Sequence, residues 1–294
     1  MFQLPSPIQK IESELTQKFD VQLFIKRDDL IHPEISGNKW RKLKYNIAQA
    51  QLENKHTLLT FGGAFSNHIT ATAAAGKYLN FRTIGLIRGE KYTPLNASLQ
   101  FAESCGMELF YVDRTAYKQK NISTVLTQIP NYVAADIFVL PEGGASEWAL
   151  KGCAEIVDEI NIDFDFICCA CGTGTTIAGI ATNLKNTQQA IGFPVLKHPN
   201  LHQEIEQKIP DLKSNFSLID ASIGGYAKTT PQLVQFIKAF YHEHQILLDY
   251  VYTGKVMLRL FELIEQGYFP KKSTIVMVHT GGTMNANVFN KFKD

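Results

Sequence analysis

One lysine of this sequence stands where its amine could react with a carbonyl group. Residues 36–44 read SGNKWRKLK and place Lys39 directly after a Gly-Asn turn, at the expected start of a helix. Such a turn can direct one side chain into a cleft, where a lysine amine can form a Schiff base. A basic surface face is the simpler interpretation for any single lysine of this kind. We expect the other basic side chains of the helix to face solvent: Arg41, Lys42 and Lys44.

A second stretch has the form of a phosphate-binding turn. Residues 168–180, CCACGTGTTIAGI, pass from an apolar strand through a Gly-Thr turn into a helical segment. The first N–H groups of a helix are free and its dipole is positive there, so this arrangement favours a phosphate. The pattern is neither GxxxxGK(S/T) nor GxGxxG, which indicates a single phosphate monoester; a plain glycine turn is the alternative. The candidate ligands are Thr173, Gly174, Thr175 and Thr176.

A third stretch repeats this order of strand, turn and helix. Residues 60–79, TFGGAFSNHITATAAAGKYL, place Ser66, Asn67 and His68 at the head of an alanine-rich segment. Ser66 and Asn67 are good helix N-caps, and that structural role is one interpretation. The other is that donors at this helix start bind a carboxylate or a phenolate-like oxygen of a ligand. Together with Lys39 and a monophosphate turn, they are the groups needed to hold pyridoxal phosphate as a Schiff base.

Composition and charge argue against several other classes. The chain has 294 residues, 45% of them hydrophobic, which is enough for well-filled cores in one large domain or two ordinary ones. Lys and Arg number 29 and Asp and Glu 28, so the net charge of +1 gives no general field for nucleic acid or an anionic membrane. The opening residues lack a secretory signal pattern and no apolar run of about 18 residues occurs, so we expect a cytoplasmic protein.

The cysteines indicate buried packing in a reducing compartment. There are five, and Cys168, Cys169 and Cys171 are close neighbours in the chain. Such near neighbours pair poorly with one another, so we expect small free thiols in a buried strand. The alternative is a metal site, but the CCxC spacing lacks the two-residue spacer of zinc sites and no matching Cys or His cluster follows. We therefore expect no metal.

Short β-branched or aromatic runs alternate with longer stretches of helical periodicity, which predicts an α/β fold with mainly parallel sheets. The expected strands are 23–26, 57–61, 82–87, 108–112, 135–140, 164–170, 189–193, 217–220 and 273–278. The expected helices include 39–54, 67–78, 95–105, 146–159, 175–184, 231–244 and 254–266. No repeat or linker divides the chain, but its size favours two domains.

Several motifs follow one another along nearly the whole chain: PSPIQKI, LFIKRDDL, SGNKWRKL, FGGAFSNH, LPEGGAS, CGTGTTIAGI, VYTGK and HTGG. In kind and order they resemble a group of pyridoxal-phosphate enzymes that contains D-cysteine desulfhydrase and 1-aminocyclopropane-1-carboxylate (ACC) deaminase. The resemblance implies the tryptophan synthase β-like fold (fold type II), with two open, twisted, mainly parallel sheets flanked by helices and pyridoxal 5'-phosphate between two domains. It also implies a homodimer and a smaller domain, residues 42–146, inserted into a larger one of 1–41 and 147–294.

The resemblance implies a role for each candidate residue. Lys39 would bind the cofactor as a Schiff base and, once free, take the α-proton of a small amino-acid substrate. Asn67 would contact the phenolic oxygen of the cofactor, and the 173–176 turn would hold its phosphate. Ser66 would be a catalytic residue and, with Asn67 and His68, would bind the substrate carboxylate. Two tyrosines would face the substrate as catalytic residues: Tyr226 and Tyr252.

Two further positions bear on the choice of substrate within this family. Within the family that the chain resembles, ACC deaminases carry Glu and Leu at these positions, whereas this chain has Thr253 and Thr280, as desulfhydrase-type members do. A Thr280 hydroxyl would be a neutral partner of the pyridine nitrogen, which leaves that nitrogen less protonated than a carboxylate would. A less protonated pyridine ring withdraws electrons more weakly, which suits elimination of the thiol from D-cysteine to give pyruvate, ammonia and sulfide. Thr253 would lie beside the substrate. We therefore expect a D-cysteine desulfhydrase.

Two alternatives remain open. One is an ACC deaminase, a lyase or a hydrolase by class, which would release 2-oxobutanoate and ammonia. The other is a non-catalytic protein that binds a phosphate ligand or an amino acid on the same scaffold, in which Lys39 is only a surface cation.

Overall fold

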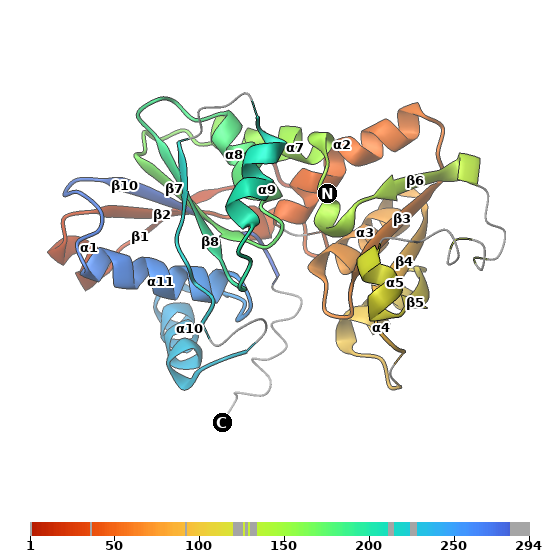
Figure 1. The fold of residues 1–294 in the computed structure, drawn as a ribbon. Helices are drawn as coiled ribbons and strands as arrows, with labels where there is room; N and C mark the ends of the chain where they lie inside the picture. Colours follow the sequence, from red (N-terminus) through yellow and green to blue (C-terminus); the bar gives the residue numbers. More distant parts are fainter. Residues whose placement is uncertain are drawn as a thin grey trace.

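Two β-sheets, each covered by helices, form the protein (Figure 1). The computed structural model describes residues 2–35, 37–91, 93–119, 126, 129, 134–210, 215–223 and 228–282. Within these residues the larger sheet has six strands in the order β1-β2-β10-β7-β8-β9, and the smaller has four in the order β5-β4-β3-β6. Strand β1 pairs antiparallel with β2, and the other neighbouring strands pair in parallel.

The larger sheet is buried on both faces. Its strands are β1 (Ile8–Ile11), β2 (Gln22–Lys26), β7 (Phe166–Cys171), β8 (Gln189–Pro194), β9 (Phe216–Leu218) and β10 (Thr274–Val278). Ile275 and Met277 of β10 belong to a core with α11, whereas Val276 and Val278 belong to a core with α8. Because both faces are apolar, β10 reads as a continuous apolar run. The helices around this sheet are α1 (Glu14–Lys18), α8 (Thr175–Thr182), α9 (Leu201–Lys208), α10 (Pro231–His244) and α11 (Thr253–Glu265).

The smaller sheet is also covered on both faces. Its strands are β3 (Thr57–Gly63), β4 (Arg82–Arg88), β5 (Glu108–Val112) and β6 (Ile137–Leu140). Leu58 of β3 packs in a core with α2 and α3, and the next residue, Leu59, packs in a core with Tyr117 of α5. The helices of this half are α3 (Asn67–Leu79), α4 (Ala97–Ser104) and α5 (Arg114–Gln119).

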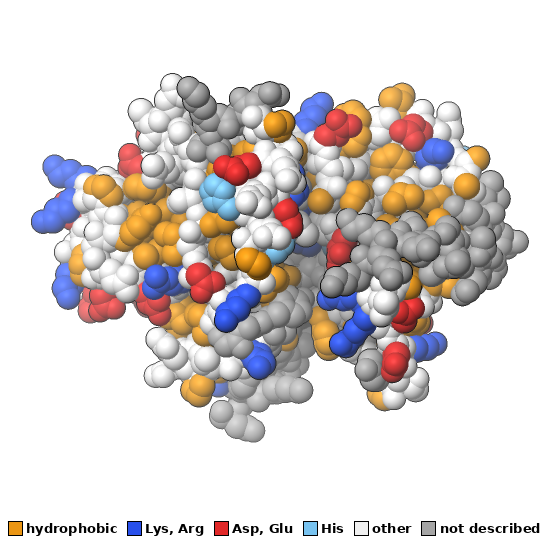
Figure 2. Space-filling model, in the orientation of Figure 1, with side chains coloured by type: hydrophobic (Ala, Val, Ile, Leu, Met, Phe, Trp, Pro, Cys, Tyr) orange, Lys and Arg blue, Asp and Glu red, His pale blue; other side chains and the backbone are white. Residues whose placement is uncertain are grey.

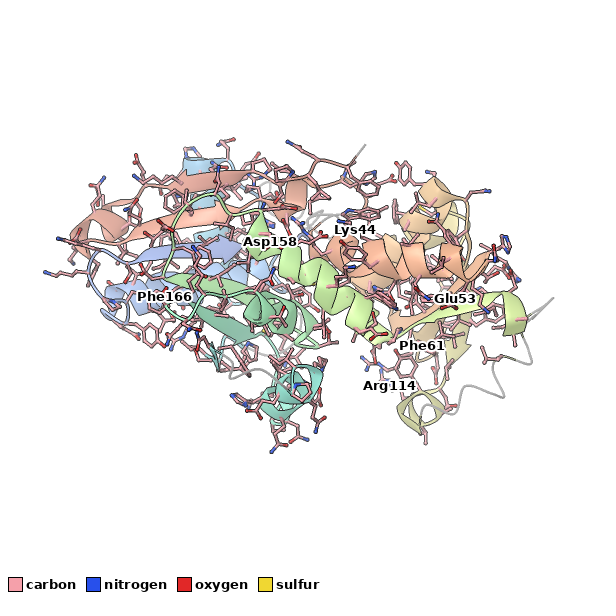
Figure 3. All side chains as sticks on the ribbon, turned by 90° about the horizontal axis from the view of Figure 1, so that it is seen from above. Lys44, Glu53, Phe61, Arg114, Asp158 and Phe166 are labelled. Atoms are coloured by element: carbon pink, nitrogen blue, oxygen red, sulfur yellow. The ribbon has the colours of Figure 1, made fainter. Side chains whose placement is uncertain are left out.

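Two helices connect the halves. Helices α2 (Asn38–Leu52) and α7 (Glu147–Asp158) lie side by side, and in Figure 3 α7 lies across the boundary between the sheets with Asp158 at its end nearer the larger one. Gly152 permits this approach, because a Cβ there would lie 1.9 Å from the Arg41 backbone oxygen. The surface is indented between the two halves (Figure 2). The described residues also form three short 3-10 helices: η1 (Asp28–Leu30), η2 (Ala134–Asp136) and η3 (Glu142–Gly144).

The fold class expected from the sequence is confirmed, and every expected strand and helix is present, with ends that match or differ by one or two residues. The sequence analysis missed β1, α1, α5 and α9, which are short and have few residues over which a period can be recognised. The smaller sheet spans residues 57–140, inside the segment expected as an insertion. The domain bounds at 41 and 147 stay a prediction.

The five cysteines are free and buried, as the sequence analysis expects. Cys168, Cys169 and Cys171 lie in β7 at the centre of the larger sheet. In the part of the chain that the structure describes, no helix has both the length and the apolar character needed to cross a membrane.

Candidate active site

The candidate residues gather at the carboxyl ends of the parallel strands. Strand β3 is followed by Ser66 and Asn67, β7 by the 172–176 turn, and β10 by the 279–282 turn. Loops and helix starts converge at this edge of an α/β sheet, which is where such folds bind ligands. Lys39 reaches the same region from the start of α2.

One asparagine, Asn38, joins Lys39 to the phosphate-type turn, which consists of residues 172–176. Asn38 and Lys39 are the first two residues of α2, after Gly37, whose φ is 65°. Lys39 Nζ donates to Asn38 Oδ1 at 2.7 Å, and Asn38 Nδ2 donates to Thr176 Oγ1 at 2.8 Å. The lysine and the turn that the sequence analysis singled out therefore lie together, although they are far apart in the chain.

The amine of Lys39 is held in a state that can react. Burial and then the nearby charge of Lys42 lower the pKa of Lys39 to about 7, against a smaller opposing effect of the Asp249 carboxylate. A large fraction of the amine is therefore neutral near neutral pH. A lysine that forms a Schiff base or accepts a proton must be neutral.

The 172–176 turn is shaped to hold an anion. Gly174 has a φ of 73° and precedes α8, whose start has no side-chain cap among the described residues. A Cβ at Gly174 would lie 2.5 Å from Ile205 Cγ1, so glycine is required for both reasons. The first backbone N–H groups of α8 have no intrahelical partner. The hydroxyls of Thr173 and Thr175 lie 3.2 Å apart at this end of the helix. Such donors at the positive end of a helix favour a phosphate.

The basic residues that follow Lys39 do not all face solvent, and the expectation that they do is wrong. Arg41 is 0% exposed and Lys42 is 4% exposed, while Lys44 is partly buried beside Glu155. The reason is that this part of α2 is covered by α7 and η1 rather than by water.

Lys42 is a second buried cation of the site. Its Nζ donates to the Gly143 backbone oxygen at 3.1 Å, and no carboxylate pairs with it in the part of the chain described here. Burial lowers the pKa of Lys42. A Cβ added at Gly144 would contact both the Lys42 Cβ, at 3.4 Å, and the His68 ring, at 3.0 Å. Lys42 therefore lies where it could pair with an anionic group of a ligand.

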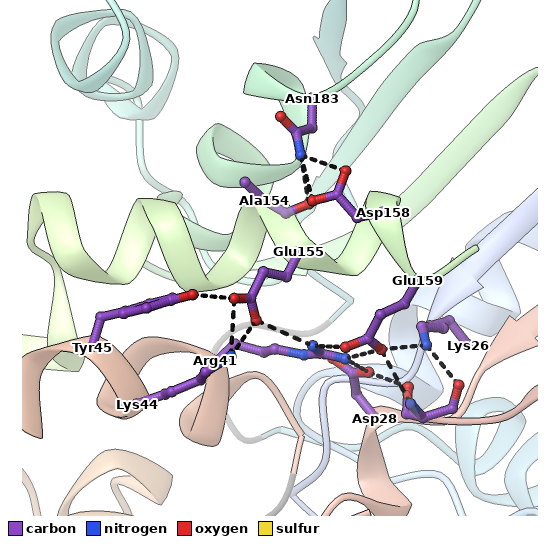
Figure 4. Close-up of polar contacts among 11 residues, drawn as sticks. Lys26, Asp28, Arg41, Lys44, Tyr45, Ala154, Glu155, Asp158, Glu159 and Asn183 are labelled. Carbon is purple, nitrogen blue, oxygen red and sulfur yellow. Dashed lines mark hydrogen bonds and ion pairs between the residues drawn. The ribbon is translucent and has the colours of Figure 1, made fainter. Parts of the chain in front are cut away.

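Arg41 belongs to a buried ion network that holds α2 in place (Figure 4). Its Nε and Nη2 donate to the two oxygens of Asp28 at 3.2 and 2.9 Å, and Nη2 also donates to Glu159 at 2.7 Å. Lys26 Nζ donates to the same Glu159 oxygen at 2.8 Å. Two cations thus face two carboxylates, which compensates for the loss of water around them.

Ser66, Asn67 and His68 form the start of α3. The Ser66 Oγ accepts from the His68 backbone N–H at 3.3 Å, so Ser66 is an N-cap. The His68 ring is 1% exposed, and neither of its nitrogens has a hydrogen-bond partner among the described residues. Burial, and then the charges of Lys39 and Lys42, lower the pKa of His68 well below its usual value, so the ring is neutral. A buried imidazole without protein partners can hydrogen-bond a ligand.

The 279–282 turn joins the starts of α2 and α3. Gly282 lies between Asn67 and Asp249, because a Cβ there would be 3.2 Å from both Asn67 Nδ2 and Asp249 Cγ. Thr280 is 7% exposed, and its backbone oxygen accepts from the Asn38 N–H at 3.3 Å. Asn67 and Thr280, expected as cofactor residues, are therefore brought to one place from the two sheets.

Asp249 organises the loop before α11. Its carboxylate accepts hydrogen bonds of 2.8 to 2.9 Å from the backbone N–H groups of Val251, Tyr252 and Thr253. The Thr253 hydroxyl donates to the same carboxylate at 2.8 Å, and Thr253 is 0% exposed. This hydroxyl is thus directed at Asp249, and the substrate contact expected for Thr253 stays a prediction.

Of the two expected tyrosines, Tyr252 lies beside the phosphate-type turn. A Cβ added at Gly172 would be 3.9 Å from Tyr252 Cε1. Tyr226 lies outside the described residues. The roles expected for both tyrosines stay predictions.

Sequence reasoning missed four residues that shape this site: Asp28, Asn38, Lys42 and Asp249. The sequence contains signals for two of them. Lys42 is three residues after Lys39 and so lies on nearly the same helix face. Asp249 interrupts the apolar run ILLDYVY, where a charged residue is expected to be paired.

Comparisons with known proteins extend over the whole of this architecture. The model of a family described as pyridoxal-phosphate dependent enzyme matches residues 2–281. A Pyrococcus furiosus protein named putative 1-aminocyclopropane-1-carboxylate deaminase is 29% identical, over 94% of this chain and 89% of its own. A bifunctional D-cysteine desulfhydrase/1-aminocyclopropane-1-carboxylate deaminase of Arabidopsis thaliana is 29% identical, over 90% of this chain and 73% of its own. A crystal structure described as that of an ACC deaminase homologue superimposes with a TM-score of 0.83 at 28% identity, over 99% of this chain and 93% of its own.

Proposed function

The chain belongs to the pyridoxal-phosphate-dependent enzyme family, and we propose that within it the protein is a D-cysteine desulfhydrase. Its cofactor is pyridoxal phosphate. In the proposed reaction, D-cysteine loses its α-proton and its thiol by α,β-elimination, and pyruvate, ammonia and sulfide are released. The observation that carries the proposal is the link of the Lys39 amine through Asn38 to Thr176 of the phosphate-type turn, in a buried place that lowers the pKa of Lys39 to about 7.

The residues of the site fit this cofactor. Lys39 offers an amine for covalent attachment, and the uncapped start of α8, among the described residues, offers N–H groups for a phosphate. Lys42 adds a buried positive charge near Lys39. Asn67 and Thr280 would contact the phenolic oxygen and the pyridine nitrogen, the roles that the family resemblance gives them.

Pyridoxal phosphate, when bound, withdraws electrons from the substrate Cα and so makes its proton easier to remove. Lys39 Nζ is the base that the site offers for this proton, because burial lowers its pKa to about 7, where much of the amine is neutral at neutral pH. The start of α3, with Ser66 and the neutral His68 ring, would bind and orient the substrate carboxylate. Tyr252, held by Asp249, would hydrogen-bond the leaving thiol from the side of the phosphate-type turn.

Two threonines support D-cysteine over ACC. Thr253 is fully buried and donates to Asp249, so a glutamate at this position, as in ACC deaminases, would place a second carboxylate against the first. Thr280 is a neutral residue at the position expected to contact the pyridine nitrogen, which supports chemistry with a good leaving group.

ACC deaminase is the second candidate, because the names of both relatives include it. The class of the enzyme is that of a lyase, and the hydrolase class expected as an alternative is wrong. The physical reason is that in the proposed reaction a bond to the substrate β-carbon would break by elimination, and water would enter only when the unsaturated product is hydrolysed.

The test is to incubate the purified holoenzyme with D-cysteine and, separately, with ACC, and to assay pyruvate, sulfide and 2-oxobutanoate. Pyruvate and sulfide in equal amounts from D-cysteine, with no 2-oxobutanoate from ACC, are the expected result. 2-Oxobutanoate from ACC without sulfide from D-cysteine would replace the proposal with the second candidate. L-cysteine is the control for stereochemistry.

The proposal includes a homodimer that works in the cytoplasm. The family resemblance supports the dimer, and five free buried thiols support a reducing compartment. Light scattering on the purified protein tests the first, and cell fractionation tests the second.

A further inference from the structure

We propose that Asn38 is a positioning residue, which holds the free amine of Lys39 and fixes its direction relative to the phosphate-type turn. The inference rests on the proposed function only in giving Lys39 its role in catalysis. In that role the free amine of Lys39 would have to stay in reach of the reacting carbon.

Two hydrogen bonds connect the side chains of Lys39, Asn38 and Thr176 in series. Lys39 Nζ donates to Asn38 Oδ1 at 2.7 Å, and Asn38 Nδ2 donates to Thr176 Oγ1 at 2.8 Å. The first bond decides the orientation of the amide, because the ammonium form of Lys39 only donates, whereas the Thr176 hydroxyl can donate or accept. With the carbonyl oxygen on Lys39, the NH₂ group is left to donate to Thr176, and a flipped amide would direct N–H groups at the ammonium.

The backbone around Asn38 leaves the amide little freedom. Asn38 is 6% exposed, and its N–H donates to the Thr280 oxygen at 3.3 Å. The preceding Gly37 donates to the Asp28 oxygen at 2.9 Å, and a Cβ on Gly37 would lie 2.0 Å from the Thr280 oxygen. The backbone of Asn38 is therefore held in place by the segments around Asp28 and Thr280, in addition to the contacts of its side chain.

An asparagine suits this position better than an aspartate would. The groups that act on the Lys39 charge are Lys42, Cys153 and Asp249, and the nearby His68 ring is neutral. A carboxylate at 2.7 Å would add a strong attraction for the ammonium form and keep Lys39 protonated at neutral pH. The amide oxygen accepts from either form of the amine without adding a charge, so it gives direction and leaves the amine able to react.

Three variants of the apoenzyme test this role. The pKa of Lys39 is measured from the pH dependence of its acetylation by acetic anhydride, followed on the Lys39 peptide by mass spectrometry. Asn38→Asp is expected to raise the pKa of Lys39 by about 1 to 3 units, and Asn38→Ala, which removes the acceptor of the ammonium, to lower it. The matched control is Asn46→Asp on the same helix. Asn46 is 1% exposed and bonds Lys42 O and Ser146 instead of Lys39.

The signs of these shifts separate positioning from structural support. If Asn38 only stabilised the fold, both of its substitutions would loosen the site, expose Lys39 and raise its pKa toward the usual lysine value. A rise in Asn38→Ala, no shift in Asn38→Asp, or an equal shift in Asn46→Asp would overturn the inference. The measurement needs neither cofactor nor substrate. A failed D-cysteine assay would therefore count against the proposed function and leave this result standing.

Discussion

Asp28 holds Arg41 through two hydrogen bonds, and both side chains are fully buried. The backbone oxygen of the same Asp28 accepts from the Gly37 N–H at 2.9 Å. Asp28 therefore contacts the chain on both sides of Lys39, two residues before it and two residues after it. The start of α2 is held by these contacts in addition to its own helical hydrogen bonds.

Replacing Asp28 by Asn should strongly destabilise the protein. The substitution keeps the shape of the side chain but leaves the Arg41 guanidinium with less buried negative charge. Breaking one half of a buried ion pair costs roughly 3 to 5 kcal/mol, and urea unfolding measures the change. Glu12→Gln is the control, because the Glu12 side chain pairs with Lys10 and is 69% exposed. This substitution should change the free energy of unfolding by less than about 0.5 kcal/mol. Equal effects of the two substitutions would show that the Asp28 network does not support α2.

Glu159 should make stability depend on acid. Burial alone would raise its pKa, but hydrogen bonds and charges from Arg41 and Lys26 outweigh burial and lower the pKa of Glu159 to about 2. A group with a depressed folded pKa stabilises the protein above its ordinary pKa of 4.5, and this contribution is lost as the pH falls toward 2. It amounts to at most about 3 kcal/mol. The free energy of unfolding should therefore fall less steeply in this window for Glu159→Gln than for the wild type.

The control for this pH effect is Asp158→Asn, one residue earlier. Asp158 accepts from Asn183 Nδ2 at 2.9 Å on the exposed side of α7, away from the two cations (Figure 4). Its substitution should leave the acid limb of the stability curve as steep as in the wild type. A parallel change in both variants would mean that the ion network is not the origin of the acid sensitivity.

The contrast between α2 and the strands shows what the sequence could predict. Strand β10 is apolar because both of its faces are buried, so its own residues indicate its state. The environment of Arg41 depends on Asp28 and Glu159, which are distant in the chain. The local sequence of a basic run does not show whether water or remote carboxylates surround it. For this reason the sequence predicts that Arg41 and Lys42 face solvent.

In the site, too, some residues could be predicted from local sequence and others depend on segments that are distant in the chain. Residues that follow a strand and a glycine turn, such as Asn67 and Thr176, could be predicted because the end of a parallel strand fixes their place. The contact of Asn38 with Thr176, and of Asp249 with Thr253, depends on the angle at which two segments meet. No local pattern encodes that angle.

Lys42 should set the pH at which Lys39 reacts. Burial and then the Lys42 charge lower the pKa of Lys39 to about 7, so its rate of Schiff-base formation should rise with pH and level off above this value. Lys42→Met removes a positive charge, which raises the pKa of Lys39 and moves the midpoint to higher pH. The measurement is the visible absorbance of apoenzyme mixed with pyridoxal, which has no phosphate for Lys42 to bind. Lys44→Met should leave the midpoint in place, because Lys44 pairs with Glu155. A midpoint that Lys42→Met does not move would count against the electrostatic coupling.

Two fully buried histidines should respond in opposite ways to replacement by leucine. Both nitrogens of His279 are used: Nε2 donates to the Leu247 oxygen at 2.8 Å, and Nδ1 accepts from the Gly281 N–H at 3.2 Å. His279→Leu should therefore cost about 2 kcal/mol or more, since two hydrogen bonds are lost in the core. His68 has no such partners among the described residues, so His68→Leu should leave the apoenzyme as stable as the wild type or slightly more stable.

The same substitution at His68 should weaken substrate binding, because the ring would lose its bonds to the ligand rather than to the protein. We expect His68→Leu to raise KM for D-cysteine by roughly tenfold or more, the cost of one hydrogen bond to a charged group. Thermal unfolding of the apoenzyme and steady-state kinetics of the holoenzyme, measured on one preparation, separate the two effects. A large loss of apoenzyme stability with unchanged KM would show that the His68 ring supports the fold and does not contact the substrate.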